Sequence, residues 1–495
     1  MPSKPALPSD LTELTAALLS QAIRNRDTSC YEVMQAYTKR IAQYNPVYNA
    51  IVSMLDTEHC LELAKEADRA LDRGEYWGWM HGMPHAIKDL ANAHGFPTSM
   101  GSPLFAGSMA AKDDLLAARI RSKGAIFIGK TNTPEFGMGS QTYNPVFGAT
   151  GSAYNPGLTA GGSSGGAACA LGTRMLPVAD GGDLMGSLRN PAAFNNVIGF
   201  RPSQGRVPSG QDDDLFYQQL GTLGPMGRNT RDTILLLDTI AGHNAGNPMS
   251  LRDALPPPTD YTALELSNLR IGWLGDYDGY LAMESGVLDV CQANLKLLSD
   301  LGAIVENCRP QFDMQELWQT WLTLRHWMRN KMHPLYEDPD SRALLKPEAI
   351  WEIEGSYDLS AKALYRAGLA RTAWYRAIST LLEKFDFLVL PSAQVFPFAK
   401  QTHWPESVNG KMMDTYHRWM EVVIGPSLAG LPVVNVPAGF DLQGRPMGMQ
   451  LIGAFGEDQG VLEFALAYEE VTDHLAQRPV LAKQNQNPVR GEKSD

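Results

Sequence analysis

Two turns rich in glycine and serine lie within one stretch of the chain, residues 161–203. The first reads Gly-Gly-Ser-Ser-Gly-Gly over residues 161–166, and the second reads Gly-Asp-Leu-Met-Gly-Ser over residues 182–187. Glycine at this density lets the backbone adopt positive φ and approach another group closely. Adjacent turns of this kind can direct hydroxyls and backbone N–H groups at one point. Acyl transfer requires that arrangement, with a hydroxyl nucleophile and amide donors for an oxyanion.

A lysine upstream of these turns could supply the base. Lys88 follows the short apolar run 85–87 and precedes Asp89. A lysine at the end of a strand usually faces solvent. Burial, however, disfavours the charged form of a lysine and lowers its pKa, so that the side chain can be neutral and basic. Beside two serine turns that need a base, Lys88 is therefore a candidate.

Two short motif matches suggest other chemistries. Residues 124–131 fit the P-loop pattern, but the four positions between its glycines are apolar and β-prone, which is typical of a core strand. Residues 161–165 fit the G-x-S-x-G nucleophile elbow, which needs a strand leading directly into the serine and a later acid and histidine. The preceding residues 155–160 are loop-like, and no later histidine stands out. We reject the P-loop and keep an α/β-hydrolase as a weak alternative.

The composition is that of an ordinary globular protein. Of the 495 residues, 44% are hydrophobic and 19% are charged, and the formal net charge is −12. This charge argues against a general affinity for nucleic acid or anionic membranes. The five cysteines include no C-x-x-C spacing, so we expect neither a disulfide framework nor a zinc site. No stretch approaches the ~20 apolar residues of a membrane span, and we expect a soluble, cytoplasmic protein.

Short β-like runs alternate with helical or glycine-rich segments along the chain. Two amphipathic helices are expected first, the second over residues 31–44 after a Ser29–Glu32 capping box. Strands that recur between helices predict an α/β fold, with a large mixed, mostly parallel-type sheet covered by helices on both faces. The strands are expected at residues 85–87, 125–128, 176–179, 271–273, 303–305, 387–390, 433–436 and 449–452.

Residues 310–385 differ from the rest because they are helix-rich and full of large side chains, Trp and Met among them. We favour a buried aromatic core face for most of these side chains. A second interpretation is that some of them line or cover an apolar substrate pocket. We predict a single domain over residues 1–482, with this helix-rich region as part of its pocket, and a flexible polar tail over residues 483–495.

Lys88 and the two serine turns together resemble the amidase signature family of serine hydrolases. The spacing between Lys88, Ser163 and Ser187 is also similar to that of the family. The resemblance runs along nearly the whole chain and rests on residues 82–89, 129–136, 161–166, 183–191, 199–203, 429–432 and 446–453.

This resemblance implies a Ser–Ser–Lys triad that hydrolyses amides through an acyl-enzyme. Ser187 would be the nucleophile, Ser163 would sit on a cis peptide and relay a proton, and Lys88 would be the general base. Ser164 is expected to bond local backbone. The implied fold is a large mixed sheet flanked by helices, and neither a metal nor an organic cofactor is implied. The implied oxyanion hole consists of the backbone N–H groups of Leu184, Met185, Gly186 and Ser187.

Five further positions take lesser roles. Asp183 and Arg189 are expected to brace the second turn, although Arg189 could instead meet a substrate carboxylate. By resemblance only, Gly137 and Met138 would line the substrate cleft through backbone atoms. Met185 stands where the family usually has glycine, and a positive φ there would strain a methionine. If instead its N–H points inward, its side chain would shape the substrate pocket with a flexible apolar wall.

We therefore expect a hydrolase of C–N bonds in small-molecule amides. Because residues 310–385 are rich in Trp and Met, apolar or aryl amides, or carbamates (urethanes), are the expected substrates. One alternative is a partner-dependent amidotransferase subunit of the glutaminase type, which would need a second chain. Another is a non-catalytic binding protein on the same fold, against which the intact Lys88, Ser163 and Ser187 argue. The sequence leaves the oligomeric state open.

Overall fold

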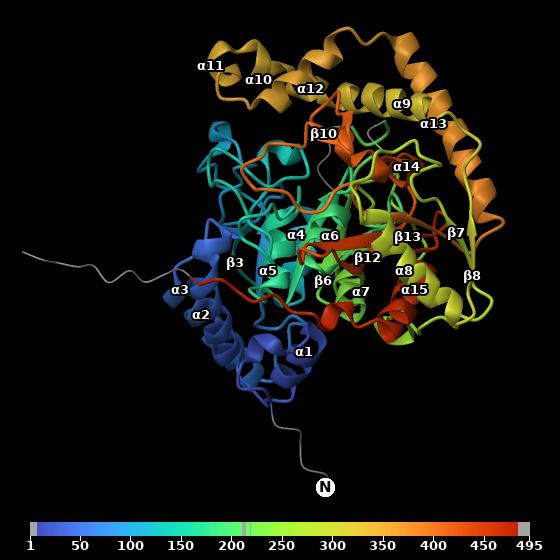
Figure 1. Cartoon of the computed structure of the whole chain (residues 1–495). Coiled ribbons are helices and arrows are strands. Elements are labelled where there is room, and N and C mark those ends of the chain that lie inside the picture. Colours follow the sequence, from blue (N-terminus) through green and yellow to red (C-terminus); the bar gives the residue numbers. More distant parts are fainter. Residues whose placement is uncertain (1–6, 210–213, 218, 484–495) are drawn as a thin grey trace, which may run out of the picture.

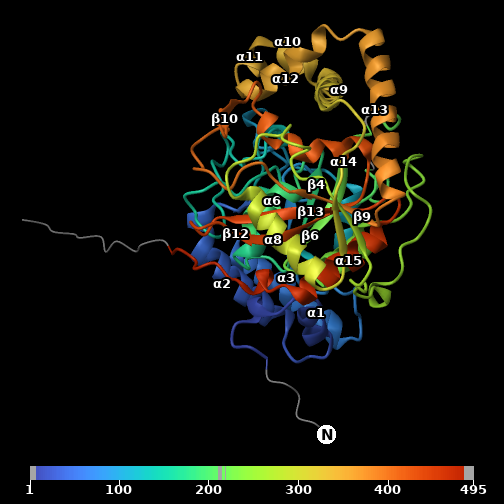
Figure 2. The same cartoon turned by 45° about the vertical axis from the view of Figure 1, so that its right-hand side comes forward.

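An eight-stranded sheet forms the frame of the molecule, with helices on both of its faces (Figures 1 and 2). The computed structural model describes residues 7–209, 214–217 and 219–483. The strands follow one another across the sheet in the order β4-β6-β5-β12-β13-β9-β7-β8. They are β4 (Val178–Asp183), β5 (Ile198–Arg201), β6 (Thr222–Gly227), β7 (Arg270–Trp273), β8 (Ile304–Asn307), β9 (Phe387–Pro391), β12 (Val433–Phe440) and β13 (Pro446–Ile452).

The predicted large mixed sheet is confirmed, but its neighbouring strands are mostly antiparallel rather than mostly parallel. Only the pairs β9–β7 and β7–β8 are parallel among the neighbours in this sheet. β4 and β5 run in the same direction, but β6 inserts between them and pairs antiparallel with both. β12 and β13 pair as an antiparallel hairpin across residues 441–445. Alternating helices and strands in a sequence do not reveal such an inserted strand or hairpin.

Lys88 belongs to a second, three-stranded sheet of order β1-β3-β2. In this sheet β2 (Pro84–Lys88) runs parallel to β3 (Ile126–Thr131), and β1 (Ile51–Val52) runs antiparallel to β3. Every residue of β2 and β3 is buried. The Gly-Lys-Thr of the P-loop match therefore lies inside a buried strand, as the apolar residues around it predicted.

One hydrophobic cluster joins the small sheet to both serine turns. It contains apolar residues of α1 (Ala16–Arg24), α2 (Cys30–Tyr48) and α3 (Thr57–Asp72). α2 begins with the predicted capping box of Ser29 and Glu32. The cluster continues through Met83, which precedes β2, and through Ala86 and Ile128 of the small sheet. It extends to Ala167 and Ala168 after the first turn and to Leu188 after the second. The N-terminal helices thus hold the strand that carries Lys88 against the two turns.

A larger hydrophobic cluster surrounds the eight-stranded sheet and includes apolar residues of helices from both halves of the chain. Phe387 to Leu390 of β9 are buried in it, and β12 and β13 contribute most of their apolar residues. The remaining helices of the body are α4 (Leu115–Ser122), α5 (Gly165–Gly172), α6 (Arg189–Asn195), α7 (Thr230–Ile240), α8 (Val287–Asp300), α14 (Ile424–Ala429) and α15 (Asp458–Val471).

The helix-rich segment predicted at residues 310–385 lies largely at one end of the molecule. In both views α9 to α12 lie above the body, and α13 descends along its side (Figures 1 and 2). Trp318, Trp321 and Trp374 are fully buried, which confirms a core face for these three. Tyr365 and Tyr375 are exposed instead. The helices are α9 (Met314–Trp327), α10 (His333–Glu337), α11 (Pro339–Arg342), α12 (Pro347–Tyr357) and α13 (Ala361–Leu382), with the short 3-10 helix η5 (Met328–Met332) after α9.

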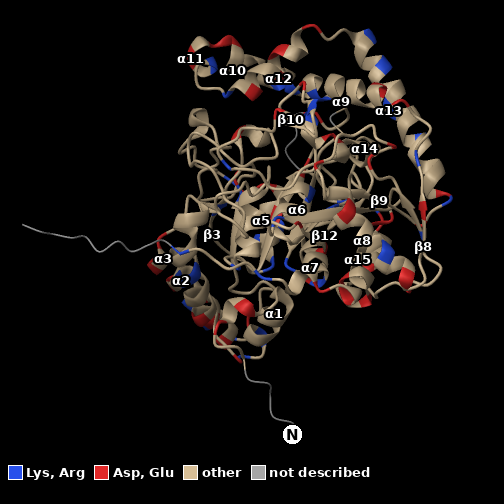
Figure 3. Cartoon of the chain, viewed as in Figure 1, with Lys and Arg blue, Asp and Glu red and all other residues tan. Residues whose placement is uncertain are grey.

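Acidic and basic residues are interspersed on outer helices such as α2, α3 and α8 (Figure 3). In the described part of the chain, no helix combines the length and apolar character that a membrane crossing requires. The predicted single domain over residues 1–482 stays a prediction, and residues 484–495 of the predicted tail lie outside the described residues.

Candidate active site

The side chain of Lys88 reaches both serines of the first turn. Its Nζ donates to Ser163 Oγ at 2.8 Å and to Ser164 Oγ at 2.8 Å. All three side chains are buried, with Lys88 and Ser163 each 3% exposed. The lysine and the serine turn, far apart in the sequence, therefore meet as a hydrogen-bonded cluster.

The surroundings of Lys88 lower the pKa of its amine to near neutral pH. Burial lowers the pKa of Lys88 to about 7, although the carboxylates of Asp180 and Asp183 oppose this shift. Asp180 lies on β4 and accepts the backbone N–H of Lys88 at 3.2 Å. It also lies 3.1 Å from Nε2 of His85. Asp180 thus ties β2 to the large sheet and limits how far the pKa of Lys88 falls.

The first turn is held in place by its neighbours. The peptide bond between Gly162 and Ser163 is cis, and Gly161 has a φ of 72°. The hydroxyl of Ser140 donates to the carbonyl oxygen of Gly162 at 2.7 Å, and that of Thr142 donates to the carbonyl oxygen of Gly161 at 2.8 Å. Side chains of the loop at 137–144 therefore fix the carbonyl groups that precede Ser163.

The second turn contacts the first directly. The backbone N–H of Ser164 donates to the carbonyl oxygen of Ser187 at 3.2 Å. Ser187 is 6% exposed, and within the described part of the chain its hydroxyl makes no hydrogen bond. Lys88, Ser163, Ser164 and Ser187 thus form one cluster in which the Ser187 hydroxyl is uncommitted.

Asp183 organises the backbone around Ser187. Its carboxylate accepts the N–H of Gly186 at 2.9 Å and that of Leu188 at 3.1 Å. Gly186 was expected to donate to the oxyanion, but its N–H already donates to Asp183. Among the described residues, no acceptor is found for the N–H groups of Leu184, Met185 and Ser187. These three amides remain as candidate donors.

Arg189 is completely engaged by the protein. Its Nε and Nη2 donate to the two oxygens of Asp183, each at 2.9 Å. The other donations go to Gln450 Oε1 at 2.6 Å, Ser427 Oγ at 2.7 Å and the carbonyl oxygen of Val423 at 3.1 Å. Every guanidinium N–H is thus used, and the side chain is fully buried. Arg189 has no donor left for a substrate carboxylate, and its contacts are those of a brace.

Two arginines hold Asp183 ionised. Burial alone would raise the pKa of this carboxyl, but Arg189 and Arg201 hold it well below its usual range. Arg201 donates to the carbonyl oxygen of Asp183 and approaches its Oδ1 at 3.3 Å. Because every partner is buried, the carboxylate remains charged across the neutral pH range and keeps accepting from the turn.

Met185 adopts its position without backbone strain. The positive φ in this turn, 77°, belongs to Gly186, and Met185 is not among the residues with positive φ. A Cβ on Gly186 would lie 2.4 Å from Oδ1 of Asn190, so the glycine is required there. The Met185 side chain is 2% exposed and packs within the cluster around the large sheet. The departure from glycine at position 185 is thus accommodated by packing.

Gly137 and Met138 contact different parts of the structure. A Cβ on Gly137 would lie 3.4 Å from Oγ of Ser163, so this backbone passes directly beside the serine. Met138 is fully buried and packs with Met332 and Ile353 of the helix-rich segment. Its carbonyl oxygen accepts from Nζ of Lys346 at 2.6 Å. The loop therefore connects the serine cluster to the helices above it.

The sequence did not single out Ser164 and Asp180 as members of the cluster. Ser164 was expected to bond local backbone, but its hydroxyl accepts from Lys88. Asp180 carried no signal in the sequence, because it is one polar residue in a strand rich in glycine. The pairing of β2 with β4 through Asp180 is a tertiary contact, and only the structure reveals it.

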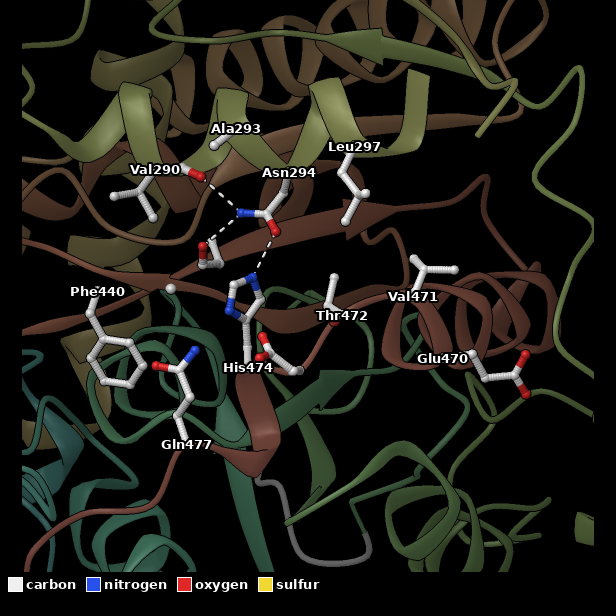
Figure 4. Close-up of a pocket in the computed structure, with 13 residues that line it drawn as sticks. Val290, Ala293, Asn294, Leu297, Phe440, Glu470, Val471, Thr472, His474 and Gln477 are labelled. Carbon is white, nitrogen blue, oxygen red and sulfur yellow. Dashed lines mark hydrogen bonds between the residues drawn. The ribbon is translucent and has the colours of Figure 1, made fainter. Parts of the chain in front are cut away.

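A separate cavity of about 780 Å³ lies between α8, β12 and the end of α15 (Figure 4). His474 Nε2 lies 2.7 Å from Oδ1 of Asn294, whose amide donates to the carbonyl oxygens of Val290 and Ala438. These polar groups hold the wall of the cavity together. None of Lys88, Ser163 and Ser187 lines it. Among the described residues, no group of three or more His, Cys, Asp or Glu could hold a metal ion.

Curated relatives of this chain include two kinds of protein. A glutamyl-tRNA(Gln) amidotransferase subunit of Cyanothece sp. is 30% identical over 94% of this chain and 99% of its own length. An acylamidase of Rhodococcus erythropolis is 29% identical over 94% of this chain and 97% of its own length.

The fold and the family agree with these relatives. A solved bacterial aryl acylamidase of the amidase signature family superposes with a TM-score of 0.87 and 27% identity, over 94% of this chain and 99% of that one. The profile of the Amidase family matches residues 32–462, most of the chain. The chain therefore belongs to the amidase signature family of C–N hydrolases.

Proposed function

We propose that this protein hydrolyses apolar or aryl amides, or carbamates, with Ser187 as nucleophile, Ser163 as proton relay and Lys88 as base. The contact between Lys88 Nζ and Ser163 Oγ, at 2.8 Å, carries this proposal. A base with a pKa of about 7 has both protonation states available near neutral pH, as an efficient acid–base catalyst requires.

In the first step, Ser187 Oγ attacks the substrate carbonyl carbon and its proton passes to Ser163 Oγ. Ser163 gives its own proton to the neutral amine of Lys88, which becomes an ammonium. The oxyanion that forms is stabilised by the amides of Leu184, Met185 and Ser187. Removing one donor of this kind typically costs on the order of 10²–10³ in rate.

In the second step, the tetrahedral intermediate collapses and its C–N bond breaks. The proton held by Lys88 returns through Ser163 to the leaving nitrogen, so an amine departs and an acyl-enzyme remains on Ser187. Water then attacks the ester along the same proton path and releases the acid. With a carbamate the same steps apply, and the released carbonic acid derivative loses CO₂.

The proposed substrate class is supported by the acylamidases among the related proteins. It is also supported by the apolar side chain of Met185 at the turn and by the buried tryptophans of the helices above the body. The carbamate branch rests on the chemistry alone, because an amide and a carbamate present the same carbonyl to Ser187.

A second candidate is a glutaminase subunit that acts only with a partner chain. The amidotransferase relatives, which align over nearly their whole length, favour this possibility. Turnover of p-nitroanilides by the purified chain alone would favour the amidase. Glutamine hydrolysis that appears only when a partner is added would favour the amidotransferase role.

The experiment that tests the nucleophile is covalent labelling with a fluorophosphonate, followed by intact-mass and peptide analysis. We expect one adduct per chain, on Ser187, and no adduct and no turnover in Ser187→Ala. Ser299→Ala, an exposed serine at the end of α8, serves as the control and should label and turn over normally. Labelling at another serine, or normal turnover by Ser187→Ala, would disprove the assignment. A protein that takes no label would be the non-catalytic alternative.

The labelled protein should then be tested on three substrate series: p-nitroanilides, aliphatic amides and aryl carbamates. We expect the highest kcat/KM among the aryl or apolar members. A preference for small aliphatic amides would contradict the proposed class while leaving the nucleophile in place.

A further inference from the structure

A leucine lies beside Ser163 without belonging to the hydrophobic core. Leu90 is half-buried, and none of the three hydrophobic clusters formed by the described residues contains it. A partly exposed leucine is common on protein surfaces and needs no explanation by itself. The place of this one, next to a serine of the proposed triad, makes it a candidate for contact with the substrate.

Gly137 brings Leu90 and Ser163 together. A Cβ on Gly137 would lie 2.8 Å from Cδ1 of Leu90 and 3.4 Å from Oγ of Ser163. The methyl group and the hydroxyl thus flank the same point, and because residue 137 is glycine, no side chain separates them. Gly137 has a φ of 69°, which other residues rarely adopt. The apolar surface of Leu90 therefore begins directly beside the serine that relays the proton.

The backbone of Leu90 is fixed at the end of β2. Its N–H donates to the carbonyl oxygen of Lys88 at 2.8 Å, and the N–H of Ala91 donates to the same oxygen at 3.0 Å. The preceding residue, Asp89, is buried and accepts the N–H of Ser99 at 3.2 Å. Leu90 is thus held in a constant position relative to the proposed base, as a residue that selects among substrates must be.

The chemistry of the proposed reaction determines which part of a substrate meets Leu90. Ser163 returns the proton to the leaving nitrogen, and proton transfer requires a distance of about 2.6–3.2 Å between the two heavy atoms. The leaving nitrogen must therefore lie against Ser163 Oγ, which Nζ of Lys88 already contacts at 2.8 Å. The side of the hydroxyl toward Lys88 is thus occupied, whereas Gly137 leaves the side toward Leu90 free of any side chain. A substituent on the leaving nitrogen fits on that free side.

The acyl part of the substrate is positioned by a different segment. Its carbonyl carbon is attacked by Ser187, and its oxygen is directed at the free amides of the second serine turn. Met185 belongs to that turn, whereas Leu90 follows β2 of the small sheet. The two apolar side chains therefore act on opposite parts of the substrate, Met185 on the acyl group and Leu90 on the leaving amine.

We propose that Leu90 is a specificity-determining residue that contacts the leaving amine and favours amides of apolar or aryl amines. This inference rests on the proposed function. Contact with Leu90 removes apolar surface of such an amine from water, and the stabilisation grows with the area removed. One methylene group in an apolar pocket typically changes specificity by about 10- to 200-fold. Because Leu90 is half-buried, we expect an effect near the lower end of that range.

The first test varies the amine while the acyl group stays acetyl, in the series acetamide, N-cyclohexylacetamide and acetanilide. Leu90→Ala should lower kcat/KM about tenfold for the two larger amides and leave that of acetamide unchanged. Leu90→Met, which keeps a long apolar side chain, should retain the wild-type preference. Leu288→Ala, at a half-buried leucine of α8, is the matched control and should change none of the three values.

The second test separates contact with the leaving amine from a general effect on the triad. The amine has departed once the acyl-enzyme exists, so Leu90→Ala should slow acylation by acetanilide and leave the deacylation rate unchanged. A series of p-nitroanilides with acetyl, butyryl and hexanoyl groups should keep its wild-type order, because its leaving group is constant. A fluorophosphonate should label Ser187 at the wild-type rate. Thermal unfolding shows whether Leu90→Ala has kept its fold, and Leu90→Val replaces it if it has not.

Four results would overturn the role of Leu90. They are unchanged kinetics in Leu90→Ala, equal losses for acetamide and acetanilide, a slower deacylation, and a changed order among the acyl groups. The last of these would place Leu90 on the acyl side of the cleft. Failure of the proposed function itself would appear in the wild type, which would then take no label on Ser187 and hydrolyse none of these amides. It would therefore be recognised before any variant is compared.

Discussion

The backbone N–H of Gly186 donates to Asp183 Oδ1 at 2.9 Å, one residue before Ser187. This bond removes Gly186 from the set of amides that can stabilise an oxyanion, but it fixes the peptide plane next to Ser187. The carboxylate in turn is held by Arg189 and Arg201. The geometry of the turn therefore depends on the buried charge cluster of Asp183, Arg189 and Arg201.

Replacing Asp183 with Asn should destabilise the fold strongly. The change leaves Arg189 and Arg201 buried without a counter-charge, and breaking a buried pair in this way costs about 3–5 kcal/mol. Urea unfolding measures the loss. Asp300→Asn is the control, because Asp300 forms an exposed pair with Lys296 and such pairs contribute about 0–1 kcal/mol. Equal small effects of the two substitutions would mean that the cluster does not stabilise the turn.

The rate should rise with pH through the pKa of Lys88. Only the neutral amine accepts a proton, and burial lowers its pKa to about 7. We expect kcat/KM to increase tenfold per pH unit below pH 7 and to level off above it. Lys88→Ala should lose on the order of 10²–10⁴ in rate at neutral pH, whereas the exposed Lys296→Ala should behave as wild type. A flat profile between pH 5.5 and 8.5 would count against Lys88 as the base.

Ser164 should influence the pKa of Lys88 rather than transfer the proton. Its hydroxyl accepts from Lys88 Nζ at 2.8 Å, and a hydrogen bond to the charged form of a group favours that form. Ser164→Ala should therefore lower the pKa of Lys88 further and move the acidic limb of the profile to lower pH. The rate on the plateau should fall by about tenfold, far less than for Ser163→Ala. An unchanged limb, or equal losses in the two variants, would contradict this assignment.

Met185 should influence which acyl groups are accepted. Met185→Ala creates space in a packed region, which costs about 2–5 kcal/mol of stability, and it should raise the kcat/KM of bulky acyl anilides relative to acetyl anilides. Met447→Ala is the matched control, since Met447 is a fully buried methionine of the same hydrophobic cluster. If both variants change the ratio equally, Met185 acts only as a core residue.

The sequence predicted the strand that carries Lys88 and its neighbour β3, because apolar runs between glycine-rich segments are local signals. It placed the strand before the second serine turn at residues 176–179, whereas β4 spans Val178–Asp183, because the apolar run ends at Ala179 and the rest of the strand consists of Gly and Asp. It missed β5 and β6, since Gly199 and Gly224 with Pro225 interrupt the apolar pattern of strands that the sheet nevertheless accommodates. The mixed sheet was predicted, but its strand directions were not, because they depend on where β6 inserts.

The site shows the same division between local and tertiary information. Lys88 and the two serine turns stand out by local residue types, and the resemblance to the family then gave Lys88, Ser163 and Ser187 their expected roles. Two of the partners of Arg189, Gln450 and Ser427, lie more than two hundred residues away, and no local pattern connects them to it.

The proposed proton path crosses from one sheet to the other. Lys88 comes from the three-stranded sheet, whereas Ser187 follows β4 of the eight-stranded sheet, and Asp180 bridges them through the backbone of Lys88. The rate of turnover should therefore depend on how closely the two sheets pack against each other. On warming, a small separation of the two sheets would stop turnover while each sheet stays folded. Loss of activity would therefore precede unfolding and would be reversed by cooling.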